Sequence, residues 1–405
     1  MMINFARGHP NPSLLPIEAM KEGLELVRCH GNLASCLPYP SSDQDNGSTM
    51  FRNQLSLFLN QHTENDDMGG FNACTTNEFF ATHGVSHAIE LLCAVLTKPG
   101  DVVGIEVPTY FLVPQILENH GLVLQPMPMK DFRLDVKGLE IMLESGQLQP
   151  IPKLIYTIPT NHNPTASTLP IEDRIQLANI ARRYNIIVIA DEVYHLLDWK
   201  VDVTRPARMA SFNHNVVEET IHGCCLSVSS FTKIFCPGIR CGWVEGPLPI
   251  IHALERYGYI RSQGGCVPFI GEVMKMIMES GLATRVLHEL QAAYQERAKI
   301  LYNALIDEAI TVCIPPTGGY FLWVLLPVDN VANFLIFCQD CGVQFLPGNT
   351  CDPFQGKSCA SYARLCFADL PLNDLTKGAK LLGTCLRQYN SEKPKFNLSS
   401  LTSNN

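Results

Sequence analysis

A lysine and an arginine lie close together in the mostly apolar segment SSFTKIFCPGIRCGW, residues 229–243. Lys233 follows hydroxyl residues that include Ser230, and Arg240 follows a Pro-Gly pair. Two cations this close need an anion, unless chemistry neutralises one of them. A lysine becomes neutral when its amine forms a Schiff base with an aldehyde, and an arginine binds phosphate through charge-assisted hydrogen bonds. The segment therefore predicts a ligand that carries both groups.

Further polar side chains follow two apolar runs that are typical of buried strands. KLIYTI (153–158) precedes Asn163, and NIIVIA (185–190) precedes Asp191 and Tyr194. Continuous Val, Ile and Leu runs that alternate with helical patterns indicate a parallel sheet covered on both faces. Ligands of such a sheet bind beyond the carboxyl ends of its strands. We therefore expect these side chains to lie at the same edge as Lys233.

A glycine turn at Gly84 opens the helical pattern SHAIELLCAVL. The first amides of a helix bind phosphate readily, because they lack intrahelical acceptors and carry the positive end of the helix dipole. We therefore predict that the backbone of Val85 and Ser86 holds the phosphate, together with Ser230 and Arg240.

An aldehyde and a phosphate on one molecule are the features of pyridoxal 5′-phosphate. That cofactor also requires a carboxylate beside its pyridine nitrogen, and Asp191 is placed for this role. Its phenolic oxygen requires hydrogen-bond donors, which Asn163 and Tyr194 can supply. Two of these residues also have an ordinary interpretation: Asp191 as a helix N-cap and Asn163 as the start of a turn before a proline.

The composition limits the class of protein. The chain has 405 residues, of which 46% are hydrophobic and 17% charged, and this is typical of compact domains rather than of a disordered chain. A formal net charge of −9 argues against a general nucleic-acid-binding surface. No apolar run reaches the roughly 20 residues that a membrane-spanning helix needs. We therefore expect no nucleic-acid partner and no membrane association.

The cysteines and the N-terminus indicate a cytoplasmic protein. The 16 cysteines have no regular spacing, and MMINFARGHP lacks the basic and apolar regions of a secretory signal. Buried thiols in a reducing compartment are therefore the expected state. Cys338 and Cys341 form a lone C-x-x-C, whereas a zinc site would need a second pair, so we expect no metal.

The predicted elements divide the chain into a large and a small part. Alternating strands and helices predict an α/β domain that binds the cofactor, with a mostly parallel sheet and helices on both faces. An amphipathic pattern over 281–308 predicts a linking helix, and strands at 320–326 and 363–368 around a helix predict a smaller α+β domain. The expected segments are an arm with part of the small domain (1–45), the large domain (46–285), the linking helix with the small domain (286–390) and a disordered tail (391–405).

These motifs, in this order, resemble the fold-type-I aminotransferases of class I/II, over nearly the whole chain. The resemblance implies that family's fold and its cofactor, pyridoxal 5′-phosphate. The matching stretches are Ser230-Phe-Thr-Lys233 followed by Pro237-Gly238-Ile-Arg240, Asn163-Pro164, Asp191-Glu-Val-Tyr194 and Arg364-Leu-Cys-Phe367.

The resemblance also implies roles that the spacing alone does not give. Arg364 would bind the substrate α-carboxylate together with Asn163. Tyr110, in VPTYF, would stack on the cofactor ring. Tyr39, in LPYP, would reach the phosphate of a neighbouring subunit, which implies a homodimer with shared active sites.

Within the family, the chain is most similar to the branch of 2-aminoadipate, kynurenine and aromatic aminotransferases, through FARGHPNPSLLP and GGYFLW. This likeness implies that Gly8 and Tyr320 contact the substrate. Where the branch has Gly-Gly, this chain has Arg7-Gly8. Arg7 is therefore a candidate to select an acidic side chain, although a solvated arginine is the commoner outcome.

The resemblance implies an aminotransferase that works by a ping-pong mechanism through Lys233. It would move the amino group of an L-amino acid, such as 2-aminoadipate or an aromatic amino acid, to a 2-oxo acid such as 2-oxoglutarate. A C–S β-lyase on the same fold is an alternative, because it shares proton abstraction by Lys233. A non-catalytic sensor of the cofactor is a second alternative. It would carry an N-terminal DNA-binding domain, for which the residues before the first motif leave no room.

Overall fold

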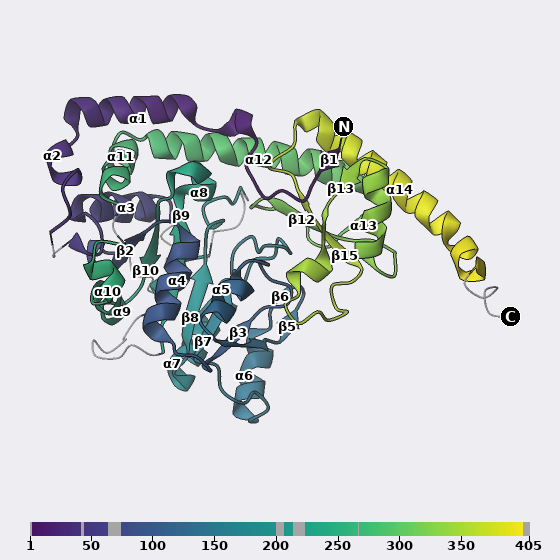
Figure 1. Ribbon diagram of the computed structural model, residues 1–405, viewed down its shortest axis with the longest axis horizontal. Helices are drawn as coiled ribbons and strands as arrows, with labels where there is room; N and C mark the ends of the chain where they lie inside the picture. The colour runs from purple at the N-terminus through teal and green to yellow at the C-terminus, as the bar shows by residue number, and fades with distance from the viewer. Residues whose placement is uncertain are drawn as a thin grey trace.

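The computed structural model describes residues 2–41, 44–63, 74–199, 206–213, 223–265 and 267–399. Its largest element is a seven-stranded sheet in the order β2-β10-β9-β8-β7-β3-β4 (Figure 1). Neighbouring strands from β9 to β4 run parallel, whereas β10 is antiparallel to both of its neighbours. The strands are β2 (Phe79–Thr82), β3 (Val102–Ile105), β4 (Val123–Pro126), β7 (Leu154–Thr157), β8 (Ile187–Asp191), β9 (Cys225–Ser230) and β10 (Gly242–Glu245).

Helices cover both faces of this sheet, because successive side chains of each strand point to opposite faces. On one face, Tyr156 belongs to a core shared with α4, α5, α9 and α10. On the other face, its neighbour Ile155 belongs to a core shared with α6 and α7. This arrangement confirms the predicted mostly parallel α/β sheet. The helices are α4 (Val85–Leu96), α5 (Val113–Asn119), α6 (Val136–Glu144), α7 (Ile171–Tyr184), α9 (Leu248–Glu255) and α10 (Gly258–Arg261).

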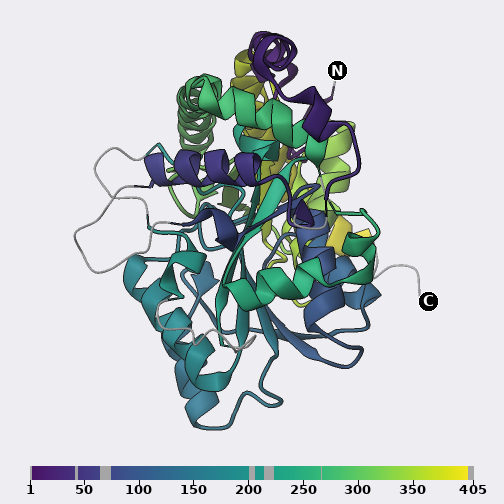
Figure 2. The same ribbon diagram turned by 90° about the vertical axis from the view of Figure 1, so that its left-hand side faces the viewer.

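A smaller module follows the long helix α12 (Leu282–Asp307) and holds an antiparallel sheet in the order β11-β12-β15-β14. Figure 2 shows α1 (Ile17–His30) and α12 at the top of the molecule, with the large sheet below them. The remaining elements of the module are β11 (Thr311–Val312), β12 (Phe321–Leu325), α13 (Val331–Asp340), β13 (Val343–Gln344), β14 (Leu346–Pro347), β15 (Tyr362–Cys366) and α14 (Leu372–Ser399). Elsewhere lie α2 (Leu33–Cys36), α3 (Thr49–Gln61), β5 (Met129–Lys130), β6 (Arg133–Leu134), α8 (Phe231–Ile234) and α11 (Pro268–Glu279).

The first residues of the chain join the small module. Strand β1 (Ile3–Asn4) pairs in parallel with β13. Residues 5–11, which we call the strap, follow this strand. The carbonyl of Phe5 accepts a hydrogen bond from the amide of Cys366 at 2.9 Å, and the amide of Asn11 donates to the carbonyl of Ala368 at 2.9 Å. Both ends of the strap are therefore fixed to the small module.

The C-terminal region differs from the sequence prediction. Helix α14 continues to Ser399, whereas disorder was predicted from residue 391. The segment lacks an apolar stripe, which is the signal for packing. Pro394 also disfavours a helix interior, so local propensity does not account for the extension. The linking helix predicted over 281–308 is α12, which spans Leu282–Asp307.

Two kinds of feature are absent from the described residues. Within the described ranges, no helix is long and apolar enough to cross a membrane. The same residues contain no group of three or more His, Cys, Asp or Glu side chains suited to a metal ion.

Candidate active site

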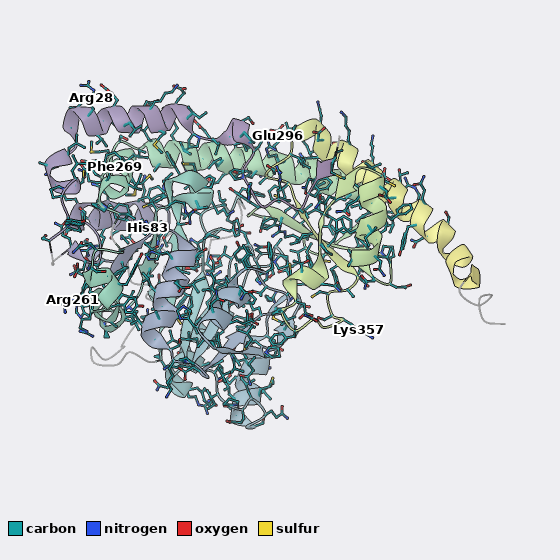
Figure 3. The ribbon with its side chains drawn as sticks, in the orientation of Figure 1. Arg28, His83, Arg261, Phe269, Glu296 and Lys357 are labelled. Carbon is teal, nitrogen blue, oxygen red and sulfur yellow. The ribbon has the colours of Figure 1, made fainter. Side chains whose placement is uncertain are left out.

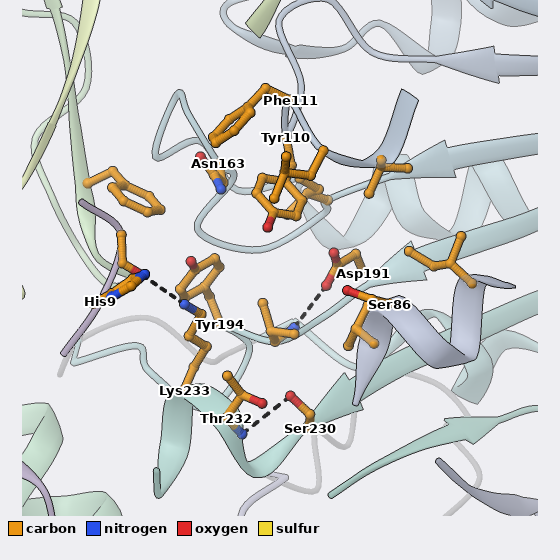
Figure 4. A pocket seen from close by; sticks show the side chains of 18 of the residues that line it. His9, Ser86, Tyr110, Phe111, Asn163, Asp191, Tyr194, Ser230, Thr232 and Lys233 are labelled. Atoms are coloured by element: carbon orange, nitrogen blue, oxygen red, sulfur yellow. Dashed lines mark hydrogen bonds between the residues drawn. The ribbon is translucent and has the colours of Figure 1, made fainter. Parts of the chain in front are cut away.

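A cavity of about 430 Å³ is lined by residues that follow β7 and β8, by the end of β9, by the N-terminus of α4 and by the strap (Figure 4). Parallel strands bring their carboxyl ends to the same edge of a sheet, which explains why these segments meet. The cavity gathers most of the predicted site residues: Arg7, Gly8, Val85, Ser86, Tyr110, Asn163, Asp191, Tyr194, Ser230, Lys233, Arg240 and Arg364.

Lys233 lines the cavity from the short helix α8, which follows β9. Its Nζ donates a hydrogen bond to the carbonyl of Gly8 at 3.0 Å. The same Nζ lies 4.9 Å from the ring centre of Tyr320. Burial lowers the pKa of Lys233 to about 8, and the positive charge of Arg364 acts in the same direction. A substantial fraction of its amine is therefore neutral and nucleophilic near pH 8.

Asp191 ends β8 and is buried. Its Oδ2 accepts a hydrogen bond from the hydroxyl of Tyr156 at 2.8 Å. Burial raises the pKa of Asp191 to about 6, while the hydrogen bond from Tyr156 and the charge of Lys233 oppose that rise. The carboxylate is therefore held ionised at neutral pH by specific partners, although its surroundings disfavour the charge.

Arg364, on β15, links the small module to the large sheet. Its Nη1 donates to Oδ1 of Asn163 at 2.9 Å, and its Nη2 donates to the carbonyl of Ala6 at 2.7 Å. The guanidinium carbon lies 4.1 Å from the ring centre of Phe321, which fixes its plane. Its buried Nε has no hydrogen-bond partner among the described residues. Part of the donor set of Arg364 is therefore available for an anion.

The turn before α4 forms a cationic cradle with Arg240. Gly84 has φ +97, in the region that favours glycine, and no side chain caps the helix. A Cβ on Gly84 would lie 2.8 Å from Nη2 of Arg240. Arg240 itself donates to the carbonyl of His83 at 3.0 Å and to Oγ1 of Thr232 at 3.3 Å. Free helix amides, hydroxyls and a guanidinium therefore converge on one small volume, where an anion would be stabilised.

Two predicted residues lie outside the cavity lining. Tyr39 is 87% exposed. Tyr320 is buried behind Lys233, and its hydroxyl pairs with the hydroxyl of Tyr294 at 3.1 Å and donates to the carbonyl of Lys233 at 3.3 Å. Because successive residues of an extended segment point to opposite sides, the neighbouring Phe321 faces the cavity instead.

Sequence reasoning missed several residues of the site. Tyr156 lies in an apolar strand pattern, and its hydroxyl is the only local signal of a polar contact. Phe111 and Phe321 also line the cavity and lie near the guanidinium of Arg364, at 5.8 and 4.1 Å. His9 lines the cavity beside Arg7, from the strap. Phe111, Phe321 and His9 lie in stretches quoted above, VPTYF, GGYFLW and FARGHPNPSLLP, but no role was assigned to them because it depends on contacts between distant segments.

Comparison with known proteins extends these observations. A sequence profile of the family described as aminotransferase class I and II matches residues 2–382. The solved structure of kynurenine aminotransferase from Pyrococcus horikoshii is 25% identical with a TM-score of 0.81, and the match covers 96% of this chain and 91% of that one. The Thermococcus litoralis protein named aromatic-amino-acid aminotransferase 1 is 25% identical over 395 residues, which are 96% of this chain and 88% of that protein. An Escherichia coli protein named uncharacterized HTH-type transcriptional regulator YjiR is 27% identical over 350 residues, which are 84% of this chain and 67% of that protein.

Proposed function

Since the chain belongs to the class I and II aminotransferases, which use pyridoxal 5′-phosphate, we propose that it moves the amino group of an L-amino acid to a 2-oxo acid such as 2-oxoglutarate. The observation that carries the proposal is a single cavity lined by Lys233, Asp191 and Arg364. These side chains are a nucleophilic amine, a buried carboxylate and a guanidinium that can bind an acid.

The donors around the cavity fit the cofactor at both of its ends. At one end, the amides of Val85 and Ser86 would hold the phosphate with Ser230 and Arg240, because the cradle at Gly84 excludes a side chain. At the other end, the carboxylate of Asp191 would pair with the pyridine nitrogen. A buried carboxylate with a raised pKa gains most from a cationic partner, which supports this orientation.

The cofactor supplies an aldehyde that binds amino groups and a ring that withdraws electrons from the substrate α-carbon. Lys233 would carry the α-proton as general acid and base, because its pKa of about 8 is close to the operating pH such a group requires. Tyr110 would pack on the ring. Tyr194 and Asn163 would donate to the phenolic oxygen, and the structure gives Nδ2 of Asn163 no partner within the described residues.

Arg364 would bind the α-carboxylate with the support of Asn163. The carbonyl of Ala6 now accepts from Nη2 of Arg364, and the carbonyl of Gly8 accepts from Lys233. A carboxylate forms stronger, charge-assisted hydrogen bonds than a neutral carbonyl does, so the substrate would replace the strap at Arg364. Glycine at position 8 would leave room for this exchange. A larger residue would crowd the strap, because its Cβ would lie only 3.1 Å from the ring of Phe321.

The strap also suggests how the substrate side chain is read. Arg7 lines the cavity, is exposed, and forms no hydrogen bond or ion pair within the described residues. A long acidic side chain, as in 2-aminoadipate or glutamate, would find a cationic partner there. Phe111 and Leu112 line the same cavity and would accept an aromatic side chain. We therefore propose acidic and aromatic amino acids as donors, with Arg7 favouring the acidic ones.

We also propose that the protein acts as a homodimer in which Tyr39 reaches the partner's cofactor phosphate. Tyr39 is too exposed to contribute to its own cavity. Exposed apolar side chains lie on the elements around it, and Figure 3 shows Arg261 and Phe269 on this same side of the molecule. These side chains are Leu33, Leu37, Met50, Tyr259 and Phe269. Such a surface favours association with a second copy.

The test is the absorption spectrum of the holoenzyme during titration with a panel of amino acids, for wild type and Lys233→Ala. Transamination predicts that the wild-type yellow band bleaches with a donor and returns when a 2-oxo acid is added. Release of ammonia and pyruvate without an acceptor would instead indicate a β-lyase. Cofactor binding without any spectral response to the panel would indicate a sensor, and either result would overturn the proposed reaction.

A further inference from the structure

Outside the cavity lining, two buried arginines pair with buried glutamates. Arg174, in the first turn of α7, is 0% exposed and pairs with Glu192 at 3.3 Å. Arg208 is 2% exposed and pairs with Glu245 at 2.7 Å. A buried ion pair costs desolvation and is weak support for stability by itself. What each arginine holds in place is therefore the more informative question.

Arg174 uses two of its three guanidinium nitrogens to hold the loop that carries Asn163. Its Nε donates to the carbonyl of Leu169 at 2.9 Å, and its Nη2 donates to the carbonyl of Pro159 and to Oγ1 of Thr160, both at 2.7 Å. These acceptors lie on both sides of Asn163 along the chain. One rigid, planar group therefore joins the two ends of this loop.

The remaining nitrogen of Arg174 reaches the segment that carries Asp191. Its Nη1 donates to Oε1 of Glu192 at 3.3 Å and to the carbonyl of Ala207 at 2.9 Å. Glu192 directly follows Asp191, and its amide and carbonyl are both bonded to β9, at Val228 and Ser229. One side chain therefore ties the end of β7, the end of β8 and the segment before Met209 together.

We propose that Arg174 is a positioning residue for the reaction, which sets Asn163 and Asp191 in register with each other through Glu192 and Thr160. The inference rests on the proposed function, because it assigns those two residues to the cofactor. A shift of the loop after β7 would move the Asn163 amide away from the cofactor's phenolic oxygen and from Arg364. A misplacement of about 1 Å at such a site costs on the order of a hundredfold in rate.

Arg208 provides a matched control. It is also buried and paired with a buried glutamate, to which it donates two hydrogen bonds, at 2.7 and 3.2 Å. Its Nη1 donates to Oγ1 of Thr63 at 2.7 Å, as Nη2 of Arg174 does to Thr160. Because Arg208 lies between Ala207 and Met209, which bind Arg174 and Glu192, the two threonines are the closer match. Neither Glu245 nor Thr63 adjoins a residue that lines the cavity. The variants Arg174→Lys and Arg208→Lys therefore remove the same kind of group, and Thr160→Val and Thr63→Val remove the same kind of acceptor with little change of shape.

The experiment compares these four variants with wild type as holoenzymes. We expect Arg174→Lys and Thr160→Val to release the cofactor about tenfold or more faster and to raise the KM for the amino acid. The pH midpoint of the bound cofactor's absorption band should move to higher pH, because a misaligned Asn163 donates less to the phenolic oxygen. Arg208→Lys and Thr63→Val should lower the melting temperature only.

The results distinguish a positioning role of Arg174 from a purely structural role. If all four variants lose melting temperature alike and keep the wild-type cofactor release, KM and pH midpoint, Arg174 is structural only and the inference is overturned. Should Arg174→Lys fail to fold, the pair Thr160→Val and Thr63→Val decides by the same readouts. A wild-type protein that does not bind the cofactor would instead refute the proposed function, which separates the two failures.

Discussion

The two sides of the cavity are built differently. On the cofactor side, Asp191 and Ser230 are buried, and Asp191 is fixed by the side chain of Tyr156. On the substrate side, Arg7 and His9 are exposed, and the hydrogen bonds that the described strap residues accept from Lys233 and Arg364 go to backbone carbonyls. Side-chain contacts in a packed interior have few alternatives, whereas a carbonyl on a cation can be exchanged for a stronger anion.

This difference suggests that the two sides of the cavity have separate roles. With the cofactor bound as proposed, the groups on its side would need little rearrangement, because they are already buried and hydrogen-bonded. The substrate side presents its cations already covered by weak, neutral acceptors, which a substrate carboxylate can replace. Substitutions on the cofactor side should therefore alter cofactor binding and pH dependence, and those on the substrate side should alter KM and selectivity.

The largest expected effect is at Lys233, where the two sides meet. Lys233→Ala should lower kcat by about 10³-fold or more, because it removes the proposed general acid and base. Lys275→Ala is the control, since Lys275 is a buried lysine paired with Glu272 at 3.0 Å outside the cavity. That variant should lose melting temperature and keep turnover. Comparable kcat losses in both variants would argue for a stability effect rather than for catalysis.

Arg364→Lys would test whether the substrate side acts independently. Lysine keeps the charge but loses the planar fork that holds Asn163 and a carboxylate together. We expect KM to rise about tenfold to a hundredfold for every amino acid donor, with cofactor affinity unchanged. Steady-state kinetics and a cofactor titration measure the two quantities. An equal loss of cofactor affinity would show that the two sides are coupled.

Tyr156→Phe would probe the cofactor side through pH. The hydrogen bond from Tyr156 lowers the pKa of Asp191 from what burial alone would give, so its loss should raise that pKa above about 6. The acidic limb of kcat/KM should then move up by about one pH unit, with activity recovering at alkaline pH. Tyr294→Phe, which removes another buried hydroxyl, should leave the limb in place. An unmoved limb in Tyr156→Phe would assign it to another group.

The smallest expected effect is at Arg7. Because this side chain is exposed, Arg7→Ala should lower kcat/KM for 2-aminoadipate and glutamate by only about two- to fivefold. Turnover of leucine should stay unchanged, and added salt should reduce the wild-type preference. Competition assays with paired donors give the ratio directly. Equal losses for all three donors would remove Arg7 from substrate selection.

Much of the site was predictable because its chemistry lies in short motifs at strand ends. Asp191, Lys233 and Asn163 lie within five residues of the end of an apolar run, so the parallel topology brings them to one edge. The fold class was predictable for the same reason, since the alternation of strands and helices is a local property.

The rest depended on contacts between distant segments. Tyr156 reaches Asp191 only because β7 and β8 pair in their observed register. Arg174 reads as one polar residue of an amphipathic helix, and nothing local indicates that it is buried. Tyr320 and Phe321 are adjacent, so a small difference in the entry to β12 decides which of them faces the cavity. The strap contacts join residues separated by more than two hundred positions.

The attachment of β1 and the strap has a practical side. A purification tag at the N-terminus would lie next to β1, the strand that pairs with β13. In the sequence it would precede by only a few residues the carbonyls that accept from Lys233 and Arg364. Deleting the first nine residues would likewise remove the two backbone carbonyls that accept hydrogen bonds from Lys233 and Arg364. The end of α14 lies far from that region (Figure 1). Tags, labels and surface tethers therefore belong at the C-terminus. An N-terminal tag that displaces the strap would alter the measured kinetics, because the strap contacts Lys233 and Arg364.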